Sequence, residues 1–196
     1  VREAIALAVD RQGCWDRTGG GSGVPAEYMI SPVFSNYVKD EYKLPERNVE
    51  EAQRLLEEAG LTKDADGYYL HVTLDCFESG NWNDLAAVIQ QNLKEAGIDM
   101  TINMMEMAAW QDKVLVNGDF TMTMLAGYQG PDISGIDGRV RTDASSNVAG
   151  YSNPELDALL AEGVTLSNEE ERIAVYAEVQ RILREDLPII PIIDNG

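Results

Sequence analysis

The fold is decided by residues 69–104, which read YLHVTLDCFESGNWNDLAAVIQQNLKEAGIDMTINM. Residues 69–77 alternate apolar with polar or smaller side chains, a pattern typical of a strand with one buried face. Residues 83–96 carry apolar side chains at helical spacing, and Gly97 ends that pattern. Residues 98–104 alternate again. A strand, a helix and a second strand joined by short connections normally form a right-handed crossover, so we expect the two strands to be parallel.

The pattern continues with a short helix and a third strand. Residues 108–117 have apolar side chains at helical spacing, Gly118 closes the helix, and residues 120–126 form an apolar run. The order βαβαβ predicts an α/β fold, with a mostly parallel or mixed sheet flanked by helices. One sheet is expected to contain the three predicted strands, residues 70–76, 98–104 and 120–126.

Two helices are predicted before this sheet. Residues 1–10 place Val1, Ile5, Ala8 and Val9 on one buried stripe, so they read as the end of an amphipathic helix whose other flank is polar. Residues 48–60 form a second helix, in which Asn48 is the N-cap and Glu51 completes a capping box. Gly60 suits the left-handed position that ends this helix.

Other segments connect to the sheet or follow it. Residues 18–35 include four glycines within five positions, so we expect an extended crossing segment there. Two further helices are predicted at the C-terminal end: residues 152–163, capped by Ser152 or Asn153, and residues 168–187, capped by Asn168. The apolar run at 188–194 contains two prolines, which places it on a sheet edge or in a crossing segment.

The net charge argues against several classes of partner. The chain has 34 acidic and 15 basic side chains, which gives a formal charge of −19 at pH 7. This charge repels phosphate backbones and anionic lipids, so we expect no nucleic acid and no membrane-surface partner. The sequence has no apolar stretch near the roughly 18 to 20 residues that span a bilayer.

The cysteine and histidine content argues against a metal site. Cys14 and Cys76 fit neither the CxxC spacing nor a zinc-ligand spacing, and His71 is the single histidine. We therefore expect no metal and no cofactor. Whether the two cysteines pair stays open, because the sequence does not give the distance between their Cα atoms.

The candidate binding site follows the third predicted strand. Residues 122–141, MTMLAGYQGPDISGIDGRVR, leave that strand as a glycine-rich loop. Ligands bind at the carboxyl ends of strands in open α/β sheets, and Asn81 and Trp82 follow the first strand at what should be the same edge. Amide, aromatic and charged groups orient polar ligands, so the predicted ligand-binding residues are Asp132, Tyr128, Gln129, Arg139, Trp82 and Asn81.

These residues also have structural interpretations. The loop is equally compatible with an ordinary glycine-rich surface turn. Arg139 would either pair bidentately with a ligand carboxylate or form a loop-stabilising ion pair with Asp137 or Asp143.

Seven motifs, taken in order, resemble one protein family across essentially the whole chain. They are VREAIALAVDR, GGGSGVPAEYMISP, NVEEAQRLLEEAG followed by a DG turn, NDLAAVIQQNLKEAGIDM, GDFTMTMLAGYQGPD, GYSNPELDALLAEG and ERIAVYAEVQRILREDLPIIPI. In this order they resemble the family 5 extracellular solute-binding proteins, the peptide- and nickel-type receptors of ABC importers.

The resemblance implies a fold, a function and a location. Residues 1–196 would form a single α/β lobe of the periplasmic-binding-protein type II fold, the C-terminal lobe of a two-lobed protein, with extra C-terminal helices. The protein would be a non-enzymatic receptor that binds a peptide or other small polar solute between its lobes and delivers it to ABC transporter permease subunits. It would act outside the cytoplasm, in the periplasm or as a cell-surface lipoprotein, attached to the membrane only through a leader or lipid anchor outside this sequence.

The resemblance also gives Asp132 a specific role. The family's acid that pairs with a ligand amine falls in a motif that often reads Asp-Pro, and here Asp132 is followed by Ile133. We expect Asp132→Asn to weaken ligand binding by roughly 10 to 100-fold. We expect the stability to change little, because a carboxylate in a loop should have few packing contacts.

Two other classes of function compete with this interpretation. A hydrolase could use paired carboxylates such as Asp132 and Asp137 as general acid and base. Alternatively, the same lobe could be the ligand-sensing module of a regulator.

Overall fold

The computed structural model of the protein describes residues 1–127 and 129–195. Contacts within the chain divide it into two compact units. Unit 1 contains Val1–Pro25, Pro45–Ala126 and Asn195, and unit 2 contains Ala26–Leu44 and Gly127–Asp194. The expectation of a single lobe over residues 1–196 stays a prediction.

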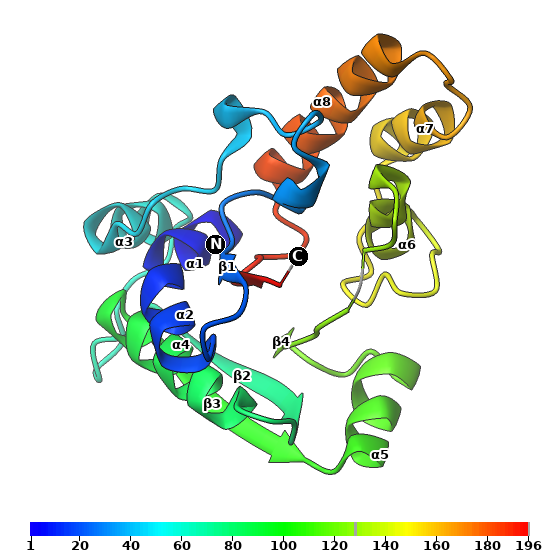
Figure 1. The fold of residues 1–196 in the computed structure, drawn as a ribbon. Coiled ribbons are helices and arrows are strands. Elements are labelled where there is room, and N and C mark those ends of the chain that lie inside the picture. Colours follow the sequence, from blue (N-terminus) through cyan, green and yellow to red (C-terminus); the bar gives the residue numbers. More distant parts are fainter. Residues whose placement is uncertain (128, 196) are drawn as a thin grey trace. The chain divides into compact units, whose positions relative to one another are not determined.

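Three parallel strands form a sheet in unit 1, in the order β3-β2-β4 (Figure 1). Their bounds are β2 (Leu70–Phe77), β3 (Ile98–Met105) and β4 (Met122–Thr123). Leu70 lies opposite Ile98 in the first pair, and Leu74 lies opposite Met122 in the second. The prediction that these three runs share one sheet is confirmed.

Threonine side chains replace part of the backbone ladder beside β4. The Thr121 hydroxyl accepts a hydrogen bond from the Thr73 amide at 3.1 Å and donates to the Thr73 carbonyl at 3.0 Å. The Thr123 hydroxyl donates to the Asp75 carbonyl at 2.7 Å and accepts from the Trp110 indole at 3.0 Å. The predicted length of this strand was therefore wrong: β4 covers two residues, because hydroxyls make bonds that a longer backbone ladder would have made.

Helix α4 (Trp82–Glu95) connects β2 to β3 and packs against β3 (Figure 1). This is the predicted crossover, and it produces the core of unit 1. Burying each large apolar side chain contributes roughly 1.5 to 3 kcal/mol. The core side chains that the helix and strands share, each at most 5% exposed, are Leu74, Cys76, Ala86, Ile89, Leu93, Ile98 and Met100.

The first helices of unit 1 differ from the prediction. In α1 (Arg2–Ala8), residues 4–8 are all buried, because the helix packs against both α3 (Val49–Glu58) and α4. The expected polar flank is therefore missing along most of α1, and Val1, which we placed on the buried stripe, is exposed. The sequence analysis also missed α2 (Arg11–Thr18), whose N-cap Asp10 accepts from the Gly13 amide.

The N-terminus of α3 is capped on one side only. The Asn48 side chain accepts from the Glu51 amide at 3.0 Å, as predicted. The Asn48 amide donates to the Leu7 carbonyl at 2.8 Å, and the Glu51 carboxylate pairs with Arg54. The reciprocal half of the capping box was therefore wrong, because both of its groups have other partners. Gly60 ends the helix at a φ of +82°, as expected.

The remaining elements of unit 1 are short. They are β1 (Val24–Pro25), α5 (Met107–Trp110) and the π-helix η3 (Gln111–Val116). The segment 18–35 that we expected to be extended begins with the last residue of α2 and contains β1 and the short helix η1 (Pro32–Phe34).

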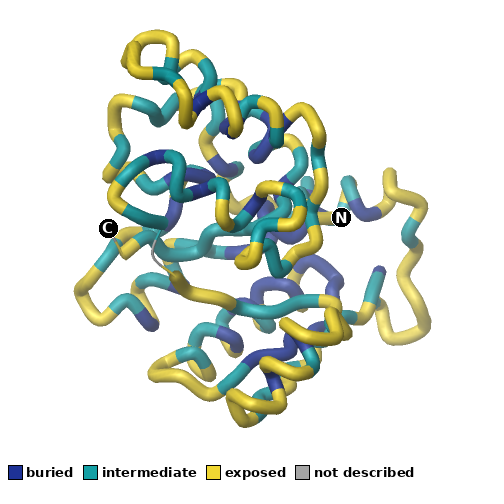
Figure 2. Tube along the Cα trace, turned by 90° about the vertical axis from the view of Figure 1, so that its right-hand side faces the viewer, coloured by how far each residue is buried: buried dark blue, intermediate teal, exposed yellow. Residues whose placement is uncertain are grey.

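Unit 2 consists mainly of helices. Its elements are η1, η2 (Asp40–Tyr42), η4 (Ile133–Ile136), α6 (Asp137–Val140), α7 (Pro154–Gly163), α8 (Glu169–Asp186) and β5 (Ile193–Asp194). Asn153 caps α7 and Asn168 caps α8, as the sequence predicted. Figure 2 shows buried residues alternating with exposed ones along the trace, as amphipathic helices require.

Helices α7 and α8 pack on each other through a close contact. A Cβ atom at Gly163 would lie 2.9 Å from the ring of Tyr176, which is itself fully buried. Glycine is therefore required for this approach. Buried leucines at Leu156, Leu160 and Leu183 complete the contact.

A buried glutamine attaches the N-terminal segment of unit 2 to α8. The Gln180 side chain, 1% exposed, donates to the Tyr37 carbonyl at 2.7 Å and accepts from the Lys39 amide at 3.2 Å. It also donates to the Tyr176 carbonyl at 2.9 Å. One side chain thus satisfies two backbone groups in the connection between η1 and η2.

Both cysteines are free, buried thiols. Burial raises the pKa of Cys14 to about 12 and that of Cys76 to about 11. The question that the sequence left open is therefore answered: the two cysteines do not pair in this structure.

Candidate functional site

Residues 129–141 of the predicted ligand loop lie in unit 2 and form two short helices, η4 and α6. Three of its apolar residues, Ile133, Ile136 and Val140, are buried. Ile133, at the place where the resembling family often has proline, is fully buried. These side chains fix the loop against unit 2 and leave the polar residues between them to make specific contacts.

Asp132 caps η4 and forms an internal ion pair. Its Oδ1 atom accepts from the Ser134 amide at 3.0 Å and from the Ser134 hydroxyl at 2.6 Å. The Arg172 guanidinium donates to Oδ1 at 2.5 Å and to Oδ2 at 2.9 Å, a bidentate pair. The side chains of Asp132 and Arg172 are 48% and 19% exposed, respectively.

The partners of Asp132 determine its protonation state. The hydrogen bonds from Arg172, and after them those from Ser134, hold the pKa of Asp132 well below its usual value, although partial burial opposes this. The expectation that Asp132 has few structural contacts was therefore wrong. Its carboxylate connects the loop to α8, across 40 residues of sequence.

Arg172 is the central residue of this cluster, and the sequence analysis missed it. Its Nε atom donates to the Gly163 carbonyl at 3.1 Å, and its guanidinium lies over the rings of Tyr37 and Tyr176. One signal existed in the sequence: Arg172 lies four residues before Tyr176 and eight before Gln180, on the face of α8 that is buried. A charged residue on such a face needs a partner.

Gln129, another predicted loop residue, bonds to a residue far away in the sequence through one of its two polar atoms. The Gln129 Oε1 atom accepts from the Ser31 amide at 3.4 Å. Its Nε2 atom is buried and has no hydrogen-bond partner among residues 1–127 and 129–195. Tyr128 lies outside the described residues.

Among the described residues, Arg139 does not form the loop ion pair proposed from the sequence, and its pairing with a ligand carboxylate stays a prediction. Its guanidinium donates to the Gly127 carbonyl. Asp137, one of the acids proposed as its partner, pairs instead with Arg141 at 2.7 Å. The spacing of four residues along α6 and its continuation favours that pair.

The remaining two predicted residues lie in unit 1, at the start of α4. The Asn81 side-chain amide donates to the Thr18 carbonyl, which attaches the end of α2 to the start of α4. Trp82 lies 4.8 Å from Phe77, and Phe77 lies 4.7 Å from the buried Trp110, measured between ring centroids. The structure thus places Asn81 and Trp82 with the sheet, and Gln129, Asp132 and Arg139 in unit 2.

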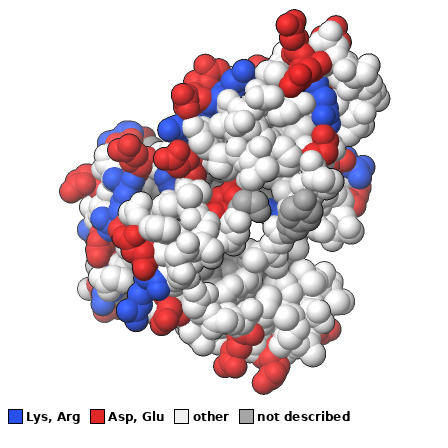
Figure 3. Space-filling view, viewed as in Figure 1, with Lys and Arg blue, Asp and Glu red and all other residues white. Residues whose placement is uncertain are grey.

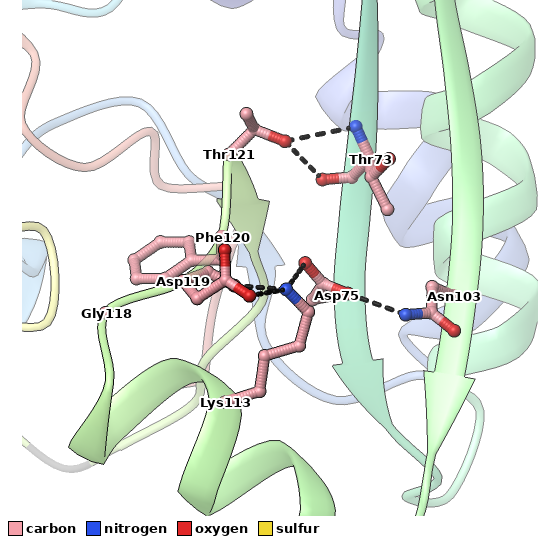
Figure 4. Close-up of a pocket in the computed structure, with 8 residues that line it drawn as sticks. All are labelled: Thr73, Asp75, Asn103, Lys113, Gly118, Asp119, Phe120 and Thr121. Carbon is pink, nitrogen blue, oxygen red and sulfur yellow. Dashed lines mark hydrogen bonds and ion pairs between the residues drawn. The ribbon is translucent and has the colours of Figure 1, made fainter.

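A second polar cluster lines a pocket of about 360 Å³ in unit 1 (Figure 4). Asp75, 2% exposed, accepts from the Asn103 amide at 2.7 Å and pairs with Lys113 at 3.5 Å. Lys113 also donates to the Asp119 carboxylate at 3.0 Å. Because Lys113 pairs with both carboxylates, the cluster acts first as a structural connection between η3 and β2.

The surface carries mixed charges. On the face drawn in Figure 3, lysine and arginine side chains lie beside aspartates and glutamates. Within the part of the chain that the structure describes, no helix is both long and apolar enough to cross a membrane. In the same residues, no group of three or more histidine, cysteine or acidic side chains is arranged to hold a metal ion.

Comparison with known proteins now decides the family. The model of the bacterial extracellular solute-binding proteins, family 5 (middle), matches residues 1–137. The chain belongs to this family. The resemblance that the sequence motifs suggested is therefore confirmed, and family 5 members are proteins that bind solutes for transport.

Curated family 5 relatives match nearly all of this chain. The oligopeptide-binding protein AppA of Bacillus subtilis is 28% identical over 202 residues, which cover 96% of this chain and 37% of AppA. Heme-binding protein A of Haemophilus influenzae is also 28% identical, over 98% of this chain and 36% of that protein. The chain thus spans a little over a third of the length of these relatives, which are named for different ligands.

A solved family 5 structure confirms the fold. Haemophilus influenzae OppA, in complex with RPPGFSPFR, matches with a TM-score of 0.81 and 26% identity, over 100% of this chain and 39% of OppA. The α/β fold of the periplasmic-binding-protein type II lobe, with its parallel sheet and C-terminal helices, is therefore the fold of this chain.

Proposed function

We propose that this chain is part of the substrate-binding component of an ABC importer, which binds a peptide or other small polar solute outside the cytoplasm and delivers it to membrane permease subunits. The observation that carries the proposal is the likeness, over the whole chain, to OppA in complex with RPPGFSPFR. The family match over residues 1–137 supports the location outside the cytoplasm.

The contacts in the loop argue against the competing hydrolase. A general acid must carry a proton near neutral pH, and Arg172 holds the pKa of Asp132 far below that range. Asp137, the second acid of the suggested pair, is bonded to Arg141. Asp132 therefore cannot be the proton donor of such a pair.

The solute contacts are proposed from what the internal bonds leave available. Asn81, Asp132 and Arg139 all bond to other groups of the chain. Trp82 is partly exposed at the carboxyl end of β2, and Gln129 has a side-chain nitrogen without a described partner. We therefore propose Trp82 as the first solute contact to test, while Gln129, whose unpartnered nitrogen is buried, and Tyr128 stay predictions.

A thermal-shift screen of the full-length protein tests the function. Peptides of three to nine residues, a nickel–histidine mixture, heme and sugars would each be added to protein from which bound solutes have been removed. A solute that binds only the folded state raises the melting temperature with its concentration, by roughly 2.7 kcal/mol of stability at 100 times Kd. Peptides are expected to raise it. A shift with sugars alone would replace peptides as the solute class, and a shift with none of the compounds would contradict the proposal.

Two tryptophan variants then test the site. Trp82→Ala should weaken binding of any peptide found, whereas Trp15→Ala is the matched control, because the Trp15 indole donates to the Ser22 carbonyl elsewhere in unit 1. Equal affinity of both variants would remove Trp82 from the site.

A further inference from the structure

We propose that Arg172 is a positioning residue that holds the Asp132 loop, residues 129–136, in its conformation, and that the protein therefore does not select its solute by pairing a free amino group with Asp132. The first part concerns the chain alone. The second part rests on the proposed function and narrows its solute class.

The hydrogen bonds of the Asp132 carboxylate use most of its capacity. An ionised carboxylate offers about four lone-pair sites on two oxygens. Oδ1 accepts from the Ser134 amide, the Ser134 hydroxyl and Arg172, and Oδ2 accepts from Arg172. An incoming amine would have to share Oδ2 with the guanidinium.

The charge of Arg172 makes that sharing unfavourable. An ammonium group at Oδ2 would lie close to the carboxylate and nearly as close to the guanidinium, so attraction and repulsion largely cancel. A carboxylate attracts an amine strongly only when no other cation already neutralises its negative charge. Peptides with a blocked N-terminus should therefore bind as well as free peptides.

Arg172 is suited to hold the loop because it is itself held. It projects from the first turn of α8, where its Nε atom is bonded to the Gly163 carbonyl and its NH1 atom to the Tyr37 hydroxyl at 3.4 Å. The rings of Tyr37 and Tyr176 lie 5.8 and 5.5 Å from the guanidinium carbon. A bidentate bond to a fixed guanidinium sets both the position and the rotation of the Asp132 carboxylate, and through it the Ser134 amide.

Hydrogen exchange in the full-length protein tests the positioning role without any ligand. Asp132→Asn and Arg172→Gln should speed exchange of the Ser134 and Gly135 amides roughly tenfold or more, the factor expected when a charge-assisted bond is lost. Arg172→Lys keeps the positive charge but loses the paired N–H donors of the guanidinium. Its exchange rate should lie between those of the wild type and Arg172→Gln. Arg141→Gln is the matched control, because it removes a guanidinium that pairs with Asp137 just beyond the loop.

The same exchange data separate loop release from general destabilisation. The amides of β2 and α4, in unit 1, should exchange at the wild-type rate in every variant. Unchanged exchange at Ser134 and Gly135, or an equal acceleration in β2, α4 and the loop, would overturn the positioning role.

A pair of probe peptides tests the second part. RPPGFSPFR and its N-acetyl form should bind the full-length protein with Kd values within about threefold of each other, before and after Asp132→Asn. A weakening of roughly tenfold or more on acetylation, removed by Asp132→Asn, would show that Asp132 does bind an amine and overturn the inference. If neither form binds, RPPGFSPFR is not a solute of this protein. The hydrogen-exchange data then test the positioning role of Arg172 by themselves.

Discussion

The Oδ2 atom of Asp75 lies 3.5 Å from the Nζ atom of Lys113, so that a carboxylate only 2% exposed on the central strand is neutralised from the π-helix η3. A buried charge without a partner is costly, and therefore the stability of unit 1 depends on this pair and on Asn103.

We expect Asp75→Ala to lower the free energy of unfolding by roughly 2 to 3 kcal/mol, because it removes the shared acceptor of Asn103 and Lys113. Urea unfolding of the variant measures the change. Asp119→Ala is the control: Asp119 pairs with the same lysine, but its side chain is 81% exposed, so its removal should change the stability by less than about 0.5 kcal/mol. Equal effects would mean that burial of Asp75 is not what matters.

We expect Gly163→Ala to destabilise unit 2 by roughly 1 to 3 kcal/mol, because the added methyl group would lie 2.9 Å from the ring of the fully buried Tyr176. Gly138→Ala in α6 is the matched control, since a Cβ there meets nothing within 4 Å. The control should be neutral or slightly stabilising. Thermal unfolding of both variants compares them, and a neutral Gly163→Ala would contradict the close packing of α7 on α8.

We expect both cysteines to resist modification in the folded protein. The thiolate is the reactive form, and burial raises the pKa of Cys14 to about 12 and of Cys76 to about 11. A thiol-reactive dye at pH 8 should label neither residue in the native protein and both in guanidinium chloride. Rapid labelling of the native protein would show that one of the thiols is accessible.

We expect His71 to make stability depend on pH on the alkaline side of its ordinary pKa. Its ring nitrogens contact Asp64 at 2.7 Å and Asp99 at 2.8 Å, and these hydrogen bonds raise its pKa above 6.5. The contribution of the charged ring is therefore fully present below pH 6.5 and is lost as the pH rises through the higher folded-state pKa. An NMR titration gives that pKa directly. The melting temperature of His71→Gln should vary less between pH 6 and 9 than that of the wild type, and identical pH profiles would contradict this role.

The parts of the fold that were predicted correctly depend on local patterns. The strands at Leu70 and Ile98 alternate, and the caps at Asn48 and Asn168 bond to amides three residues later. Where a distant group competes, the local pattern fails. In the predicted capping box, the Glu51 carboxylate pairs with Arg54 instead, and the Asn48 amide donates to the Leu7 carbonyl.

In the candidate site, too, the local pattern was predictable and the distant partner was not. The glycine-rich loop and its carboxylate were visible in the sequence, but their interpretation needed the partner of Asp132. That partner lies 40 residues away, on a helix whose position no local pattern fixes. The expected role of Asp132 in binding an amine stays a prediction, and the competing structural role is now the one that its contacts support.

The threonine hydroxyls beside β4 help to fix the point at which the chain leaves the sheet. Unit 1 ends at Ala126, three residues after the hydroxyl of Thr123 that bonds to the Asp75 carbonyl. Replacing a threonine by valine removes such a bond and leaves the shape of the side chain almost unaltered. The point where the polypeptide departs from the sheet therefore depends on single oxygen atoms, and exchanging one of them for a methyl group should shift that point while the hydrophobic interior stays intact.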